Sequence, residues 1–279
     1  MGNQCQSLCN KPIEMDKDYI SMQSLRNKIS NSSEEILEKH KPSENGIIVF
    51  KAEKLKELNS ETKIRWEKEE EVKIPQKMLR ESFINYPEIG PYRYPDGSTY
   101  LGQFKSGKRH GFGQWISSSG HCIYEGLWLD DEESLYGRTI NRNGDVYKGE
   151  MRKGKFHGYG ELRKQDGYSY QGYWFQGFQD ANGDETFPDN SVYSGEFKTG
   201  KRHGKGVLIE PDGTYYTGDF YEGYKHGFGE EKSSDGSTYK GNWKKGKKNG
   251  KGEMIFPNGT RFVGNYQDGL KENYGEFYL

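Results

Sequence analysis

The stretch "YLGQFKSGKRHGFG", residues 100–113, decides how most of this chain is interpreted. Tyr100, Gly102 and Phe104 lie two residues apart and would share one face of a β-strand, because side chains alternate along a strand. Gly111 and Gly113 are spaced in the same way on the next stretch. The "KSGKR" between them has the composition of a tight turn. The stretch therefore predicts a β-hairpin in which rings and bare glycines share a face.

The same pattern returns along the chain, with the frame Y-x-G-x-aromatic-x-x-G-x-x-H-G-x-G. The other close copies are "YKGEMRKGKFHGYG" (147–160), "YSGEFKTGKRHGKG" (193–206), "YTGDFYEGYKHGFG" (216–229) and "YKGNWKKGKKNGKG" (239–252). The last three begin at Tyr193, Tyr216 and Tyr239, a period of 23 residues. Each unit is followed by a short linker ending in a turn, so the sequence predicts consecutive antiparallel hairpins.

Two units depart from the frame, "YEGLWLDDEESLYG" (124–137) and "YQGYWFQGFQDANG" (170–183), and "FVGNYQDGLKENYG" (262–275) is a truncated last unit. The first lacks two of the glycines, and the second has Ala181 in place of one. We expect a bend, a bulge or a binding notch at these two units, the alternative being simple drift in a tolerant repeat.

The frame resembles the MORN repeat (membrane occupation and recognition nexus) over residues from about 95 to 279. The resemblance implies a mainly β fold, an elongated, twisted single-sheet meander of antiparallel β-hairpins with seven units and a partial eighth. Glycines on one strand would leave room for rings from its neighbour, which explains why the sheet uses few aliphatic side chains.

Composition agrees with this architecture and limits the function classes. Hydrophobic residues make up 31% of the chain, whereas 21 Tyr, 14 Phe and 5 Trp are too many for a disordered protein. The net charge of −1 gives no general electrostatic case for nucleic-acid binding. No nucleophile elbow, phosphate loop or metalloprotease motif is present, so we expect no enzyme activity and no cofactor.

Four histidines, at 110, 157, 203 and 226, occupy one repeat position. Adjacent units would place them roughly 10 Å apart, which is too far for several of them to bind one zinc ion. Their expected role is therefore structural, as residues that bond to the turns.

Repetition also brings equivalent turns to the same edge of the sheet, and one set of turns is basic. It supplies Lys105, Lys108, Arg109, Lys153, Lys155, Lys198, Lys201, Arg202, Lys244, Lys245, Lys247 and Lys248. The opposite edge carries Asp96, Asp145, Asp166, Asp189, Asp212 and Asp235. The basic row is a candidate binding surface for anionic lipid headgroups or for an acidic protein. The alternative is that these residues are solvated and keep sheet edges apart.

Residues 1–90 do not contain the repeat frame. Apolar residues at helical spacing predict a helical, partly disordered segment over 19–90, after a disordered tail over 1–18 and before the β region at 91–279. The helical segment could pack on the sheet, pair with a partner helix or stay partly disordered. No run of about eighteen apolar residues suggests a membrane span.

The first residues, "MGNQCQSLCN", contain candidate lipidation sites at Gly2, Cys5 and Cys9. Gly2 fits N-myristoylation, although Gln6 stands where Ser or Thr is usual. One myristoyl chain binds membranes only marginally, so S-acylation of Cys5 or Cys9 would supply the second anchor. The alternative is an unmodified tail.

These features predict a non-enzymatic scaffold, peripheral at the cytosolic face of a membrane, with protein partners and with anionic phospholipid as a candidate ligand. A cytoskeletal or ciliary structural component is the main alternative, and a regulatory subunit of a lipid-metabolising enzyme is another. Unpaired strands at the sheet ends also allow a homodimer.

Overall fold

The computed structural model describes residues 74, 86 and 88–279 of the chain. The predicted tail at 1–18 and nearly all of the predicted helical segment lie outside these residues. The chain divides into two compact units, Met1–Lys155 and Phe156–Leu279, which we describe separately. All regular elements of the described residues are β-strands.

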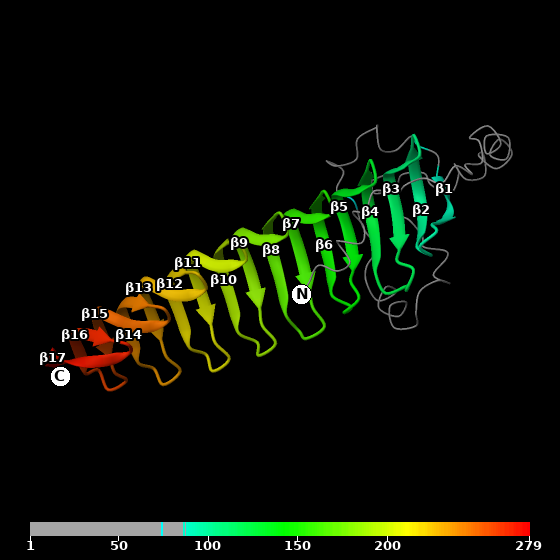
Figure 1. Ribbon diagram of the computed structural model, residues 1–279. Helices are drawn as coiled ribbons and strands as arrows, with labels where there is room; N and C mark the ends of the chain where they lie inside the picture. The colour runs from blue at the N-terminus through cyan, green and yellow to red at the C-terminus, as the bar shows by residue number, and fades with distance from the viewer. Residues whose placement is uncertain (1–73, 75–85, 87) are drawn as a thin grey trace, which may run out of the picture. The chain divides into compact units, whose positions relative to one another are not determined.

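The first unit contains six strands joined in chain order (Figure 1). They are β1 (Glu88–Arg93), β2 (Thr99–Lys105), β3 (Lys108–Ile116), β4 (Ile123–Leu129), β5 (Glu132–Ile140) and β6 (Val146–Arg152). Each pairs antiparallel with the next. Strand β1 precedes the first repeat and was not expected from the repeat frame.

The second unit, described by itself, is also a meander of β-strands, and the first residue of its first strand, Lys155, is the last residue of the first unit. Its strands are β7 (Lys155–Arg163), β8 (Ser169–Phe175), β9 (Phe178–Thr186), β10 (Val192–Lys198), β11 (Lys201–Ile209), β12 (Tyr215–Tyr221), β13 (Tyr224–Lys232), β14 (Thr238–Lys244), β15 (Lys247–Ile255), β16 (Arg261–Gln267) and β17 (Leu270–Tyr278). Consecutive strands are antiparallel neighbours throughout. The predicted meander of antiparallel hairpins is confirmed.

Tight turns set the register of each hairpin. In the β10–β11 hairpin both turn residues are left-handed, Thr199 at φ 51° and Gly200 at φ 79°. Such two-residue turns match the twist of the flanking strands. They place Lys198 opposite Lys201 and Phe197 opposite Arg202. The turn type therefore decides which face each tip residue occupies.

A bulge lies in the second strand of the repeat hairpins whose register is described, at the repeat position that carries histidine-glycine in the regular units. On β11 the register shifts between Gly195 and Glu196, and the bulged Gly204 has φ 56°. In the two units that depart from the frame, the equivalent residues are Leu135 at φ 61° and Ala181 at φ 52°. The bulge expected at these units is present, although it also occurs in the regular ones.

One face of each unit, the tyrosine face, carries the first residue of the repeat frame. Seven such tyrosines are at most 1% exposed: Tyr100, Tyr124, Tyr147, Tyr170, Tyr193, Tyr216 and Tyr239. Each hydroxyl donates a hydrogen bond to the carbonyl three residues later, as from Tyr193 to Glu196 at 2.9 Å. This bond satisfies a carbonyl near the bulge and fixes the ring.

Rings on the tyrosine face form an edge-to-face series within each unit. The Tyr193 ring lies 5.1 Å from Phe197 on its own strand and 4.9 Å from Phe220 two strands later. Glycines beside the rings have no space for a side chain: a Cβ on Gly206 would come within 2.4 Å of the Tyr193 hydroxyl oxygen. The predicted packing of rings over bare glycine backbone is confirmed.

The other face, which we call the histidine face, differs between the two units. In the first unit it is apolar and buried, with a cluster of Ile116, Ile123, Ile140 and Val146. Ile74 joins a second buried cluster there. In the second unit the same face exposes many aromatic side chains, including Phe175 at 53% and Phe178 at 54%.

Candidate functional surfaces

Three of the hairpin tips present a pair of lysines directly across from one another. Lys105 faces Lys108, Lys198 faces Lys201, and Lys244 faces Lys247. Like charges in opposed positions destabilise a sheet. The turn geometry itself does not require lysine at these positions.

Nine of the twelve predicted basic residues are exposed at these tips. They are Lys105, Lys108, Lys153, Lys155, Lys198, Lys201, Lys244, Lys245 and Lys247. Lys201 pairs with Glu222 of the next hairpin, and both side chains are about half exposed. For Lys244, Lys245 and Lys247, the described part of the chain provides no ion pair.

The other three, Arg109, Arg202 and Lys248, lie on the tyrosine face. The Arg109 guanidinium is 4.1 Å from the Trp128 ring centroid, and its Nε is 3.2 Å from Asp131. Arg202 lies over Phe187 at 4.5 Å and pairs with Glu185 at 3.0 Å. These cations stabilise the sheet through ring and carboxylate contacts, and they are not part of the exposed tips.

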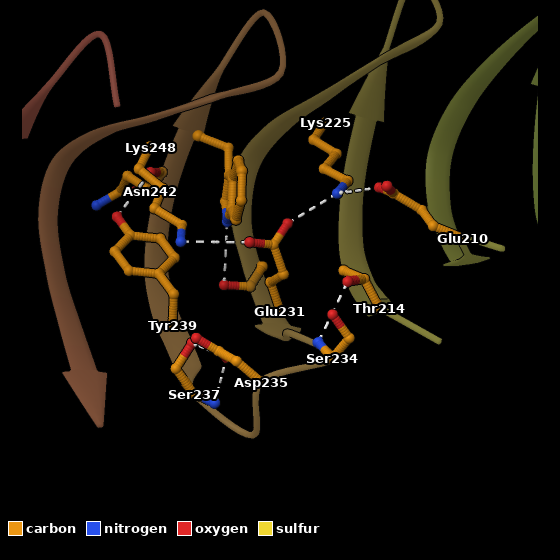
Figure 2. Close-up of polar contacts among 12 residues, drawn as sticks. Glu210, Thr214, Lys225, Glu231, Ser234, Asp235, Ser237, Tyr239, Asn242 and Lys248 are labelled. Carbon is orange, nitrogen blue, oxygen red and sulfur yellow. Dashed lines mark hydrogen bonds and ion pairs between the residues drawn. The ribbon is translucent and has the colours of Figure 1, made fainter. Parts of the chain in front are cut away.

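Lys248 belongs to a chain of charges on β13 and β15 (Figure 2). Glu231 accepts from Lys225 at 2.8 Å and lies 3.3 Å from the Lys248 ammonium. Lys225 also reaches Glu210 at 3.0 Å. All three of the central side chains are less than one-fifth exposed, which makes this network stronger than a surface pair.

Two further lysines that lie over rings of the tyrosine face, Lys225 and Lys271, were not identified from the sequence. Both stand two residues after the turn glycine, as Arg202 and Lys248 do. Lys225 lies 5.0 Å from the Tyr216 ring centroid, and Lys271 lies 4.4 Å from that of Phe256. The repeat position was the available signal, because the residue there always faces the rings.

The opposite edge of the sheet carries the acidic turns. In these turns an aspartate accepts from the backbone nitrogen two residues later, as Asp212 does from Thr214 at 2.8 Å. Hydrogen bonds from this backbone nitrogen and from the hydroxyl of the same residue favour the carboxylate and lower the pKa of Asp189 and Asp212. The Ser237 hydroxyl, followed by its backbone nitrogen, lowers the pKa of Asp235 in the same way. The acidic edge is therefore ordered by its own turn bonds.

The four repeat histidines do not share one environment. The His110 Nδ1 lies 3.3 Å from the turn residue Asp130, in the bonding role we expected. His157 instead packs on Phe175, and the rings of His203 and His226 both contact Tyr221. Within residues 74, 86 and 88–279 there is no group of three histidine, cysteine or acidic side chains that could hold a metal ion.

The candidate lipidation sites Gly2, Cys5 and Cys9 lie outside the described residues. The third cysteine, Cys122, is buried beside β4 and is disulfide-bonded. Across the described ranges, no helix combines the length and the apolar character needed to cross a bilayer.

Comparison with known protein families gives one match. The model described as "MORN repeat" matches six segments, at residues 100–122, 147–167, 170–192, 193–215, 216–238 and 239–261. The departing unit at 124–137 is not among them, whereas the one at 170–183 is. A search of curated proteins gives no significant match.

Several solved structures resemble the chain distantly. The TCP domain of SAS-4 (dCPAP) of Drosophila melanogaster, in complex with a proline-rich motif of Ana2, is 15% identical with a TM-score of 0.32. The match covers 68% of this chain and 95% of that one. The wild-type TCP10 domain of Danio rerio CPAP is 12% identical with a TM-score of 0.27, covering 65% and 95%. At these TM-scores the likenesses carry no argument about what this chain does.

Proposed function

Since this chain belongs to the MORN-repeat family, we propose that it is a non-enzymatic scaffold whose exposed hairpin tips bind anionic surfaces and whose sheet binds protein partners. The basic tips consist of Lys105, Lys108, Lys153, Lys155, Lys198, Lys201, Lys244, Lys245 and Lys247. Arg109, Arg202 and Lys248 are left out of this surface because they are engaged on the tyrosine face.

The observation that carries the proposal is the opposition of lysines across the tips, such as Lys244 and Lys247. An anion placed between two such ammonium groups removes their repulsion and gains two charge interactions. Each basic residue near an anionic membrane contributes about 1 kcal/mol. The three lysines of the β14–β15 tip would therefore contribute about 3 kcal/mol together.

We further propose that acyl groups at Gly2 and at Cys5 or Cys9 tether the protein at the cytosolic face of a membrane. A tether supplies the lasting attachment that weak electrostatic contacts lack. The tips would then orient the sheet on the surface. The chain has three cysteines, and Cys122 is disulfide-bonded. A disulfide to Cys5 or Cys9 would compete with acylation of that cysteine, so cysteine acylation is measured with and without reductant.

Vesicle binding tests the role of the tips. Unacylated full-length protein is sedimented with phosphatidylserine-containing vesicles, comparing the wild type with a Lys244→Gln, Lys245→Gln, Lys247→Gln variant. The control, Lys232→Gln, Lys240→Gln, Lys251→Gln, removes the same charge from exposed strand positions. We expect at least tenfold weaker binding for the tip variant and less than threefold for the control. Equal losses would show that only net charge matters and would contradict a tip-specific surface.

A further inference from the structure

On the histidine face of the first unit, one side chain from outside the repeats is fully buried. Ile74 is 1% exposed and packs with Phe112 and Leu127, with Leu135 and Tyr136 at the edge. Phe112 of β3 and Leu127 of β4 are direct cross-strand partners. They are only 6% and 2% exposed. This pair, which we call the Ile74 seat, shows how the histidine face receives an aliphatic side chain.

The second unit has an equivalent cross-strand pair, but no described side chain buries it as Ile74 buries Phe112 and Leu127. Tyr159 of β7 and Tyr173 of β8 are cross-strand partners in the same register as Phe112 and Leu127. Their rings lie 5.5 Å apart, edge to face. They are 46% and 51% exposed. Two adjacent exposed tyrosines at a position that is buried elsewhere in the chain indicate an unfilled seat.

The strand that follows each pair, β5 in the first unit and β9 in the second, belongs to a repeat that departs from the frame. In both places the bulge glycine is replaced, by Leu135 beside the Ile74 seat and by Ala181 beside the tyrosine pair. Leu135 lies in the bulge opposite Leu127, where the β4–β5 register shifts. Ala181 lies in the bulge opposite Tyr173, where the β8–β9 register shifts. Leu135 packs against the buried cluster. The smaller Ala181 is exposed and leaves the second seat more open.

We propose that the Tyr159–Tyr173 pair is a docking seat for an aliphatic side chain carried by a peptide segment of a partner protein. The model for this ligand is the chain's own Ile74, an aliphatic side chain that packs against the apolar cross-strand pair Phe112 and Leu127. The proposal rests on the scaffold function and assigns it a protein-binding surface. Phe175 and Phe178, cross-strand partners that are over half exposed, extend the apolar surface toward the tip.

The test uses a labelled peptide of residues 68–87, "KEEEVKIPQKMLRESFINYP", added to the full chain and followed by fluorescence anisotropy. We expect saturable binding that weakens at least tenfold when the peptide carries Ile74→Asp. A Tyr159→Ser, Tyr173→Ser protein should show a similar loss. The matched control is Phe228→Ser, because Phe228 holds the same repeat position at 50% exposure but faces Asn242. This control should bind within twofold of wild type.

Crosslinking keeps the test valid if a tyrosine variant fails to fold. A photoreactive leucine replaces Ile74 in the peptide, and the crosslinked residues of wild-type protein are mapped. Crosslinks to β7, β8 or β9 support the seat. Absence of saturable binding, or crosslinks confined to β3 and β4, would overturn it. Vesicle binding by the tips is unaffected by the tyrosine variants, so failure here is distinguishable from failure of the proposed function.

Discussion

The hydroxyl of Tyr216 occupies the space that a side chain on Gly229 would need. A Cβ built on Gly229 would lie 2.3 Å from that oxygen and 2.5 Å from the ring carbon that bears it. The same relationship joins Tyr193 to Gly206 and Tyr239 to Gly252. Each tyrosine ring therefore fills the space that side chains on two glycines would need, and this explains why the repeat has glycine at both positions.

Gly229→Ala is expected to destabilise the protein by about 3 kcal/mol, since the ring cannot move without losing its neighbours. The measurement is chemical denaturation followed by near-ultraviolet circular dichroism. Gly223→Ala is the matched control, because its φ is +91° and its Cβ would meet nothing within 4 Å. It should cost only the backbone strain of about 1 kcal/mol. Equal losses in the two variants would contradict the packing account.

Ala181→Gly is expected to stabilise the protein by about 1 kcal/mol. Ala181 is exposed and left-handed, at φ 52°, so the change relieves strain without removing a buried side chain. The reverse change, Gly250→Ala, should lower stability by a similar amount, because Gly250 has φ +80° and its nearest neighbour is at 3.6 Å. Thermal unfolding of both variants measures the effect, and a destabilised Ala181→Gly protein would count against it.

Glu231→Gln is expected to reduce the free energy of unfolding by about 2 kcal/mol, because Lys225 and Lys248 both lose a carboxylate that is only 12% exposed. Glu222→Gln breaks the exposed pair with Lys201 and should change stability very little. Urea denaturation compares the two. A larger effect at Glu222 than at Glu231 would show that the network on the tyrosine face is not a stabilising element.

Alkaline pH should unfold the protein through its tyrosine face. Burial raises the pKa of Tyr239 to about 12, and it also raises the pKa of Tyr170, Tyr193 and Tyr216. Because an unfolded tyrosine titrates near pH 10, the neutral folded form contributes stability below that pH and loses it as pH rises toward 12. Absorbance at about 295 nm should show these phenols ionising together with unfolding. Independent ionisation near pH 10 would contradict their burial.

Much of this architecture could be predicted from the sequence, since the spacing of Tyr100, Gly102 and Phe104 already implies a strand with rings and glycines on one face. The division of the basic residues could not be predicted from composition alone. Lys201 and Arg202 are adjacent, yet one is exposed and the other lies over Phe187. The two-residue turn decides this, because it fixes the register that places Arg202 opposite Phe197.

The histidine face was the least predictable part. Nothing in the repeat frame indicates that Phe112 and Leu127 are covered whereas Tyr159 and Tyr173 are exposed. The cover includes Ile74, which lies outside the repeats and has no periodic signal. The two units that depart from the repeat frame are the available signal in the sequence, and the frame alone does not distinguish a binding notch from drift.

Membrane fractionation tests the tethered scaffold most directly. Cells expressing the intact protein, Gly2→Ala, or Cys5→Ser with Cys9→Ser are separated into soluble, detergent-soluble membrane and detergent-resistant fractions. The account predicts that the intact protein is in the detergent-soluble membrane fraction and that both variants move to the soluble fraction. If all three distribute alike, the tether is contradicted. A shared detergent-resistant pellet would then favour a cytoskeletal role.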